Sequence, residues 1–167
     1  MAELGEANIG GRMVPAWILN GNANGLDISE SSEYPGCFYR KLSDGSVEWF
    51  NPPRLLGVEY RTTERYKGKP VYIKAVDTGA LPNATFKFVE ASFPNANAIV
   101  DYGGEAYQDA DHFIPLPCLK YGADNYNNEK GVQVTLSNGL GITIATMTDF
   151  SSFTSSSVWV KYTKSTD

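Results

Sequence analysis

The stretch Gly57–Pro82, GVEYRTTERYKGKPVYIKAVDTGALP, decides the fold class, because it contains two alternating runs on either side of a glycine turn. In the first run the positions of one parity are apolar or β-branched, with Glu64 as the exception: Val58, Tyr60, Thr62 and Tyr66. Alternation with a period of two is typical of a half-buried strand. Gly68, within Lys67-Gly68-Lys69, can adopt a positive φ without a Cβ clash. The stretch therefore predicts a β-hairpin.

A second hairpin is predicted upstream, between Cys37 and Phe50, because Asp44-Gly45 is a common two-residue hairpin turn. This turn implies four cross-strand pairs: Leu42 with Val47, Arg40 with Trp49, Lys41 with Glu48, and Tyr39 with Phe50. Asn51-Pro52-Pro53 then stops the strand, since proline lacks a donor. We place the domain boundary here, with an N-terminal extension and first hairpin over 1–55 and a C-terminal β-sandwich domain over 56–167.

The N-terminal residues are read as an extension. Residues 1–12 are expected to be a flexible lead-in, and they lack the basic and apolar regions of a signal peptide. The apolar run Met13–Leu19 is too short to span a bilayer. It is followed by the Gly- and Asn-rich segment 20–25, which breaks regular structure. The run is expected to pack on the domain or on another copy of the chain.

Downstream, residues 84–91 form a predicted strand in which Phe86 and Phe88 alternate with Thr85, Lys87 and Val89. Residues 98–102 form the next strand, and a Gly- and acid-rich loop follows it. The segment 112–119 carries prolines at alternate positions, which favours an edge strand. Residues 121–131 are expected to form a polar loop.

The last third of the chain gives the clearest alternation. A three-residue loop, Ser137-Asn138-Gly139, would bring two apolar rows onto one face, with Gly139 left-handed. Its predicted pairs are Leu136 with Leu140, Val134 with Ile142, and Val132 with Ile144. The final strand, 157–164, is expected to bury Val158, Val160 and Tyr162 and to direct Trp159, Lys161 and Thr163 to the other face.

Composition agrees with this pattern. Apolar residues make up 42% of the 167 residues and aromatic residues 13%, which supports a real core. Many short strands without a convincing helix predict an all-β, antiparallel β-sandwich with an N-terminal extension. The net charge of −5 disfavours a nucleic-acid partner. There is no run of about 18 apolar residues, so no membrane span is expected.

Two segments also carry a resemblance to a known family. EYRTTERYKGKPVYIK (residues 59–74), followed by DTGALPN (77–83), resembles a segment that recurs in tail-fibre and minor structural proteins of phages and prophages. In that family the segment opens a C-terminal β-rich domain at the tail tip. The closing strand and basic-polar tail of the family resemble VWVKYTKSTD (158–167). The resemblance spans residues 34–167, with a divergent middle.

The resemblance implies a non-enzymatic structural or adhesion domain of the virion, made in the bacterial cytoplasm. Its expected partners are a host cell-surface glycan or protein, other tail subunits, and two further copies in a homotrimer. In a reducing cytoplasm Cys37 and Cys118 are expected to be buried thiols, although the sequence does not exclude a disulfide. The alternatives are a stand-alone carbohydrate-binding module and a tail-associated glycan hydrolase.

Three groups of residues have side chains that are suited to metal binding or catalysis. The acidic segment Asp101–Glu105, with Asp109 and Asp111, offers oxygen ligands for calcium or a carboxylate pair for glycoside hydrolysis. His112 lies near these acids, but no nucleophile motif accompanies it. His112, Cys37 and Cys118 do not have zinc-site spacing. We therefore predict no catalytic residue, no metal and no cofactor.

Aromatic side chains near polar ones are the predicted ligand-binding residues, because sugar rings stack on flat apolar faces while polar groups bind their hydroxyls. Trp159 lies on the polar parity of the last strand, and Trp49 and Tyr66 have charged neighbours. The polar loop adds Tyr121, Tyr126 and Asn127. The competing interpretation is that these rings cover core edges or a subunit interface.

Overall fold

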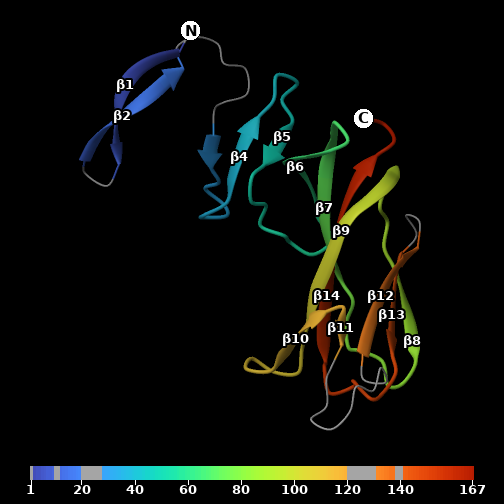
Figure 1. Cartoon of the computed structure of the whole chain (residues 1–167). Helices are drawn as coiled ribbons and strands as arrows, with labels where there is room; N and C mark the ends of the chain where they lie inside the picture. Colours follow the sequence, from blue (N-terminus) through green and yellow to red (C-terminus); the bar gives the residue numbers. More distant parts are fainter. Residues whose placement is uncertain (1, 10–11, 20–27, 120–130, 138–140) are drawn as a thin grey trace. The chain divides into compact units, whose positions relative to one another are not determined.

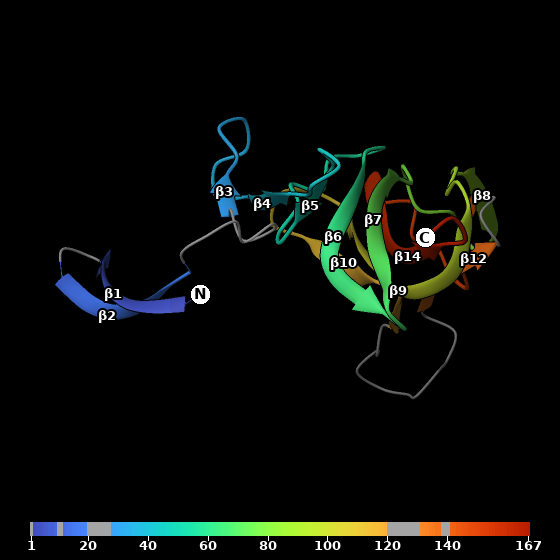
Figure 2. The ribbon, with the colours of Figure 1, turned by 90° about the horizontal axis from the view of Figure 1, so that it is seen from above.

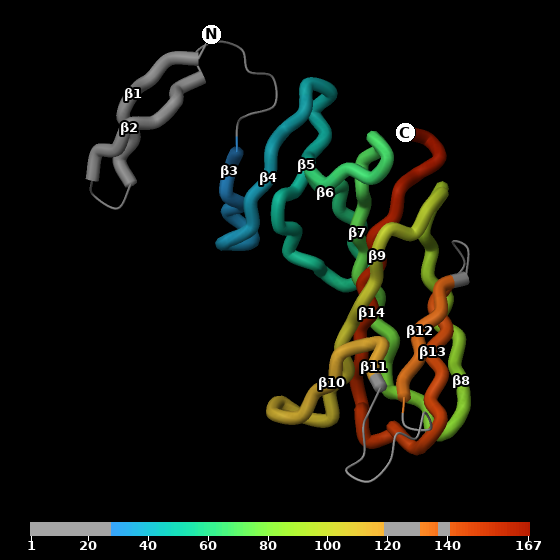
Figure 3. Tube along the Cα trace, viewed as in Figure 1, coloured from blue at the N-terminus to red at the C-terminus, as the bar shows by residue number. Residues whose placement is uncertain are grey.

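The computed structural model describes residues 2–9, 12–19, 28–119, 131–137 and 141–167, and the side chains of 28–118, 131–136 and 141–167. Over these ranges the chain forms strands and turns and no helix, so the predicted all-β class is confirmed. None of the described segments is a helix long and apolar enough to cross a bilayer. The chain divides into two compact units, Met1–Asn51 and Pro52–Asp167, at the Asn51-Pro52-Pro53 stop (Figure 1, Figure 3).

The described part of the N-terminal unit contains β1 (Ala2–Ile9), β2 (Arg12–Leu19), β3 (Ile28–Glu30), β4 (Phe38–Lys41) and β5 (Val47–Trp49). β1 pairs antiparallel with β2, from Ala2 opposite Leu19 to Ile9 opposite Arg12. The prediction of a flexible lead-in was therefore wrong. The overlooked signal is the Gly10-Gly11 pair between two strand-length runs, because Gly-Gly is a hairpin-turn dipeptide.

The β4–β5 hairpin forms as predicted but in a different register. Arg40 lies opposite Glu48 and Lys41 opposite Val47, one residue away from the predicted pairs. The loop contains three residues, since the Leu42 amide donates to the Ser46 carbonyl at 2.8 Å. Gly45 has φ +82°, and the Asp44 carboxylate accepts from the Ser46 amide at 2.8 Å. This loop lets Arg40 Nη2 reach the buried Glu48 carboxylate at 2.7 Å.

The C-terminal unit is a sandwich of two antiparallel sheets (Figure 2). The first sheet contains β10 (Phe113–Leu116), β9 (Ala96–Tyr107), β14 (Ser155–Lys164), β7 (Lys69–Asp77) and β6 (Glu59–Tyr66), in that order. The second contains β11 (Cys118–Leu119), β12 (Gly131–Ser137), β13 (Gly141–Thr146) and β8 (Phe86–Glu90).

The core lies between these sheets. Its buried side chains come from both layers and from the loops: Tyr72, Val76, Leu81, Ala91, Phe93, Ala106, Leu116, Val132, Val134, Ile142, Ile144, Phe150, Phe153, Val158, Val160 and Tyr162. The final strand contributes Val158, Val160 and Tyr162, which are fully buried as its alternation predicts. Thr163, which the alternation directs to the other face, is fully buried as well, next to a register shift of β14 on β9. Because residues of one parity fill the core, the alternate residues of β9 and β14 face outward.

The β6–β7 hairpin confirms the opening prediction. Lys67 and Gly68 both have positive φ, +50° and +81°, which is the pattern of a two-residue primed turn. Tyr66 pairs with Lys69 across this turn, and Tyr60 pairs with Ile73 farther along. The register shifts between Arg61 and Arg65, so the strand contains an irregularity that the alternation did not predict.

The acid-rich segment after residue 102 was predicted to be a loop, and this was wrong, because β9 continues to Tyr107. Its glycines are packing positions. A Cβ on Gly103 would lie 2.7 Å from Trp159 Cζ2, and one on Gly104 would lie 2.2 Å from the Ser157 carbonyl oxygen. Glycine inside a strand thus marks close approach by a neighbour.

The β12–β13 hairpin brings its apolar rows together, but the predicted pairs were wrong by two positions. Leu136 lies opposite Ile142 and Val134 opposite Ile144. The loop lies between Ser137 and Gly141, so Gly139 falls outside the described residues. The proline-containing segment does form edge strands, with β10 at the edge of the first sheet and β11 at the edge of the second.

Candidate functional site

Exposed aromatic and polar side chains gather on the outer side of the first sheet. Adjacent strands place them in three rows: Phe113, Tyr107 and Ser155; then Pro115, Glu105 and Ser157; then Gly103 and Trp159. We call this surface the aromatic face. Four residues of β9 separate the first row from the third, or about 13 Å. The middle row, between the two rows that carry aromatic rings, consists of Pro115, Glu105 and Ser157.

Tyr107 and Phe113 form the open aromatic surface of this face. Their ring centroids lie 5.7 Å apart at an interplanar angle of 33°. Phe113 is 60% exposed and Tyr107 is half-buried. The Tyr107 hydroxyl bonds to the exposed Glu105 carboxylate, and this bond, followed by desolvation, raises the pKa of Tyr107. Two adjacent rings next to a carboxylate offer apolar stacking together with a hydroxyl acceptor.

The turn that carries this ring pair is fixed by Asp109. Its carboxylate accepts from the Asp111 amide, the His112 amide and His112 Nδ1 at 2.8–2.9 Å. The bond from the His112 side chain, together with those from the amides, lowers the pKa of Asp109. The Gln108 amide also donates to the His112 carbonyl at 2.9 Å. His112 thus has a structural contact at the end of the β9–β10 hairpin.

Trp159 lies on the aromatic face, as its parity predicts, but its ring is not fully open. It is half-buried against Gly103, and the Arg54 guanidinium lies over the ring at 5.4 Å from its centroid. Arg54 has φ +54°, in the left-handed region that is costly for a residue with a side chain. Such a conformation persists only where the surroundings impose it, which makes the segment around Arg54 a candidate for function.

The remaining predicted binding residues lie elsewhere. Trp49 is half-buried on β5 of the N-terminal unit, with its ring centroid 5.3 Å from that of Tyr39. Tyr66 is at the β6–β7 turn, with Lys67 Nζ 5.4 Å from its ring centroid. Following the register through β7 and β14, Tyr66 is on the order of 30 Å along the strands from Tyr107. Tyr121, Tyr126 and Asn127 lie outside the described residues.

The residues weighed for metal binding do not converge. Among the described side chains there is no group of three or more His, Cys, Asp or Glu that could hold a metal ion. Asp109 and His112 contact one another at an exposed turn. Cys37 and Cys118, both half-buried, form no disulfide.

An open cleft lies at the edge of β7, next to the end of β8. Its volume is about 350 Å³, and its lining residues are Leu56, Gly57, Lys74, Val76, Asp77, Glu90, Ala91 and Ser92. Asp77 lies opposite Ser157 of the aromatic face, and Leu56 makes a parallel bridge to Ala75, the partner of Trp159. Because the lining residues Lys74 and Val76 pair with the buried Val160 and Val158, the cleft lies on the core side of β7, opposite to Trp159.

The sequence analysis did not select Tyr107 or Phe113, and it considered Glu105 only as a metal ligand or a catalytic carboxylate. The sequence did carry a signal for the ring pair: Tyr107 and Phe113 flank the polar segment Gln108–His112. A turn over that segment places the two residues opposite one another on β9 and β10. The mistaken loop after residue 102 hid this signal. Comparisons with protein-family models, with curated proteins and with solved structures find no match to this chain.

Proposed function

We propose that this chain is a non-enzymatic adhesion domain of a phage or prophage tail fibre or minor tail protein, and that its aromatic face binds a host-surface glycan. The observation that carries the binding proposal is the exposed Tyr107–Phe113 pair beside Glu105. Rings on a rigid sheet are preorganised, so little conformational entropy is lost when a ligand stacks on them. The tail location rests on the sequence resemblance alone.

Weak binding at one such face suits a multivalent assembly. An exposed ring pair covers a small area, and linking several copies raises avidity without any new contact. A homotrimeric fibre presenting three faces to a polymeric glycan would supply this gain. A stand-alone carbohydrate-binding module would use the same face on a single chain, so the oligomeric state separates these two candidates.

The test is a glycan array probed with the purified chain, followed by calorimetry with the best ligand. Phe113→Ala and Tyr107→Ala should each weaken binding about tenfold, a loss of about 1.4 kcal/mol. Phe86→Ala is the matched control, because Phe86 is 69% exposed on β8 of the other sheet. Unchanged binding by both face variants would refute the site. Release of new reducing ends from the ligand would instead identify the glycan hydrolase.

A further inference from the structure

We propose that the outer edge of β8 pairs, strand to strand, with the same edge of a second copy of this chain. This contact is separate from glycan binding, because β8 belongs to the second sheet and the aromatic face to the first. It follows from the direction of the backbone hydrogen bonds of β8, from a comparison with the edge strands on the opposite side of the sandwich, and from the rings on the outer side of β8.

The backbone groups of β8 point alternately to β13 and to the outer edge. β8 is the last strand of the second sheet, and β13 is its neighbour in the order. The Thr146 amide donates to the carbonyl of Thr85, just before β8, at 2.9 Å. Because hydrogen-bonded pairs alternate along an antiparallel ladder, the other odd-numbered residues of β8 also bond to β13. The N–H and C=O groups of Phe86 and Phe88 therefore point to the outer edge, where an added strand matches their two-residue spacing.

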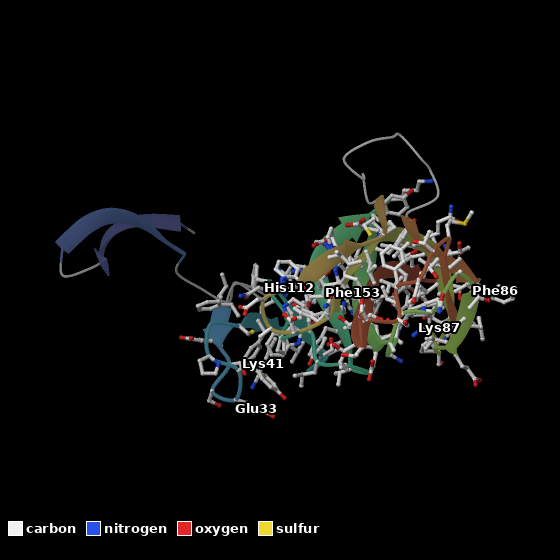
Figure 4. The ribbon with its side chains drawn as sticks, turned by 90° about the horizontal axis from the view of Figure 1, so that it is seen from below. Glu33, Lys41, Phe86, Lys87, His112 and Phe153 are labelled. Carbon is white, nitrogen blue, oxygen red and sulfur yellow. The ribbon has the colours of Figure 1, made fainter. Side chains whose placement is uncertain are left out.

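The opposite side of the sandwich is guarded against strand pairing, and β8 is not. Prolines, charges and short length commonly protect edge strands. On that side β10 contains Pro115, and β11 has two residues and follows Pro117. β8 has five residues in a continuous register with β13. Its lysine does not guard the edge, because Lys87 Nζ donates inward to the carbonyls of Thr78 and Ala80 (Figure 4).

The outer side of β8 favours a second copy as the partner. Phe86 is 69% and Phe88 53% exposed, and Met147, which is 57% exposed, extends this apolar surface. At about 200 Å² for each phenylalanine, the two rings leave about 240 Å² in water on each copy. Antiparallel pairing of two β8 strands about Phe88 places this residue opposite its own copy and Phe86 opposite Glu90, so that the rings of both copies gather on one side. One edge thus supplies both halves of a two-fold contact.

The area of this contact predicts weak association. The rings of both copies and the paired backbone bury less than the roughly 1,200 Å² of a stable complex. We therefore expect a dissociation constant weaker than micromolar, on the order of 10⁻⁴ M. The contact is thus distinct from the homotrimer, which is expected at micromolar concentration through Trp17 and Leu19, and it would join copies from different assemblies.

The experiment is sedimentation equilibrium of the full chain from micromolar to millimolar concentration. The weight-average mass of the wild type should approach twice its micromolar value. Phe88→Lys should weaken this association about tenfold or more, because two like charges would lie opposite one another. Thr135→Lys is the matched control, since it adds the same charge at an exposed position of β12, two strands from the edge, and should leave the association unchanged.

Hydrogen exchange shows which edge is covered. The Phe86 and Phe88 amides should gain protection as the concentration rises, whereas the Lys87 and Val89 amides should be protected throughout by β13. A mass that does not rise, equal association of Phe88→Lys and the wild type, or association without protection of the Phe86 and Phe88 amides would each overturn the proposal. Protection of these two amides already at micromolar concentration would also overturn it, because the edge would then be covered in another way.

Circular dichroism of each variant checks that the sandwich has formed. If Phe88→Lys does not fold, Phe88→Thr takes its place, because it keeps a good strand former and removes the ring. It should weaken the association severalfold, and wild-type association by this variant would overturn the proposal.

Discussion

Adding one methyl group at Gly103 or at Gly104 should have very different effects, although the two glycines are neighbours on β9. At Gly104 the new Cβ would lie 2.2 Å from the Ser157 carbonyl oxygen and 3.1 Å from Val158 Cα, both backbone atoms. At Gly103 it would lie 2.7 Å from Trp159 Cζ2, the far edge of a half-buried side chain. A side chain can move aside, whereas a strand in the middle of a sheet cannot.

The expected magnitudes follow from these contacts. Gly104→Ala must separate β9 from β14 by about 1 Å, which strains the core and weakens one or two ladder hydrogen bonds, a loss of about 3 kcal/mol. Gly103→Ala tilts the indole at a cost of about 1 kcal/mol, and the lower entropy of the unfolded alanine chain offsets part of it. With roughly 4 °C per kcal/mol for a unit of this size, the two melting temperatures should differ by about 10 °C.

The assay is thermal unfolding followed by circular dichroism, with urea titration as a second measure of the free energy of unfolding. Gly103→Ala should also change tryptophan fluorescence and displace Arg54 from the ring, while its unfolding midpoint remains near that of the wild type. Equal destabilisation by the two substitutions would refute the reasoning, because it would mean that Gly104 does not lie against Val158 and that the assignment of inner and outer faces is wrong.

Three further predictions concern the hairpins and the assembly. Arg40→Met should destabilise the β4–β5 hairpin by about 3 kcal/mol, because it leaves the buried Glu48 carboxylate without its 2.7 Å partner. Lys41→Met should cost under about 0.5 kcal/mol in the same urea titrations. A larger loss for Lys41→Met than for Arg40→Met would favour the two-residue loop, in which Lys41 lies opposite Glu48. Because the pKa of Asp109 is lowered, the stability that its carboxylate gives the β9–β10 turn is complete above the ordinary pKa of 3.8 and is lost as the pH falls through the lowered pKa. Loss of hydrogen-exchange protection at the turn should therefore accompany acidification of the wild type. Asp109→Asn should show no such pH-dependent loss of protection. Light scattering should give three times the 18.3 kDa monomer mass at micromolar concentration, and replacing Trp17 and Leu19 with Ser should dissociate the trimer without changing the β spectrum; a monomeric mass for the unaltered chain would remove the homotrimer.

Strand positions could be predicted from the sequence wherever one parity was clearly apolar. Val158, Val160 and Tyr162 are fully buried because no competing apolar row exists on β14. Registers were harder, since a hairpin can shift by one or two residues without changing the composition of either strand. At Asp44-Gly45 a two-residue and a three-residue loop were both compatible with the dipeptide. The buried Glu48, which needs Arg40 opposite it, favours the longer loop.

The aromatic face was only partly predictable for a related reason. Trp159 was assigned to the correct side of β14 from its own strand, but Tyr107 and Phe113 become neighbours only when two strands pair. Their pairing depends on β9 continuing through Gly103 and Gly104, residues that ordinarily indicate a loop. The reason for those glycines is the packing of Trp159 and Ser157 against them, and both partners are more than fifty residues away in the chain.

The side chains of β8 show that burial does not follow hydrophobicity alone, because its phenylalanines are exposed while a lysine lies on the core side. Phe86 and Phe88 are 69% and 53% exposed, while Lys87 of the opposite parity points back toward the sandwich (Figure 4). Lys87 Nζ donates to the carbonyls of Thr78 and Ala80, and its desolvation lowers the pKa of the ammonium group. Lys87 pairs with the buried Ile144 and therefore lies on the core side of β8, which leaves Phe86 and Phe88 on the outer side. The Tyr107–Phe113 pair differs from these rings because it lies beside the Glu105 carboxylate, which bonds to the Tyr107 hydroxyl. That difference in surroundings is why we propose the aromatic face, and not β8, as the glycan-binding surface.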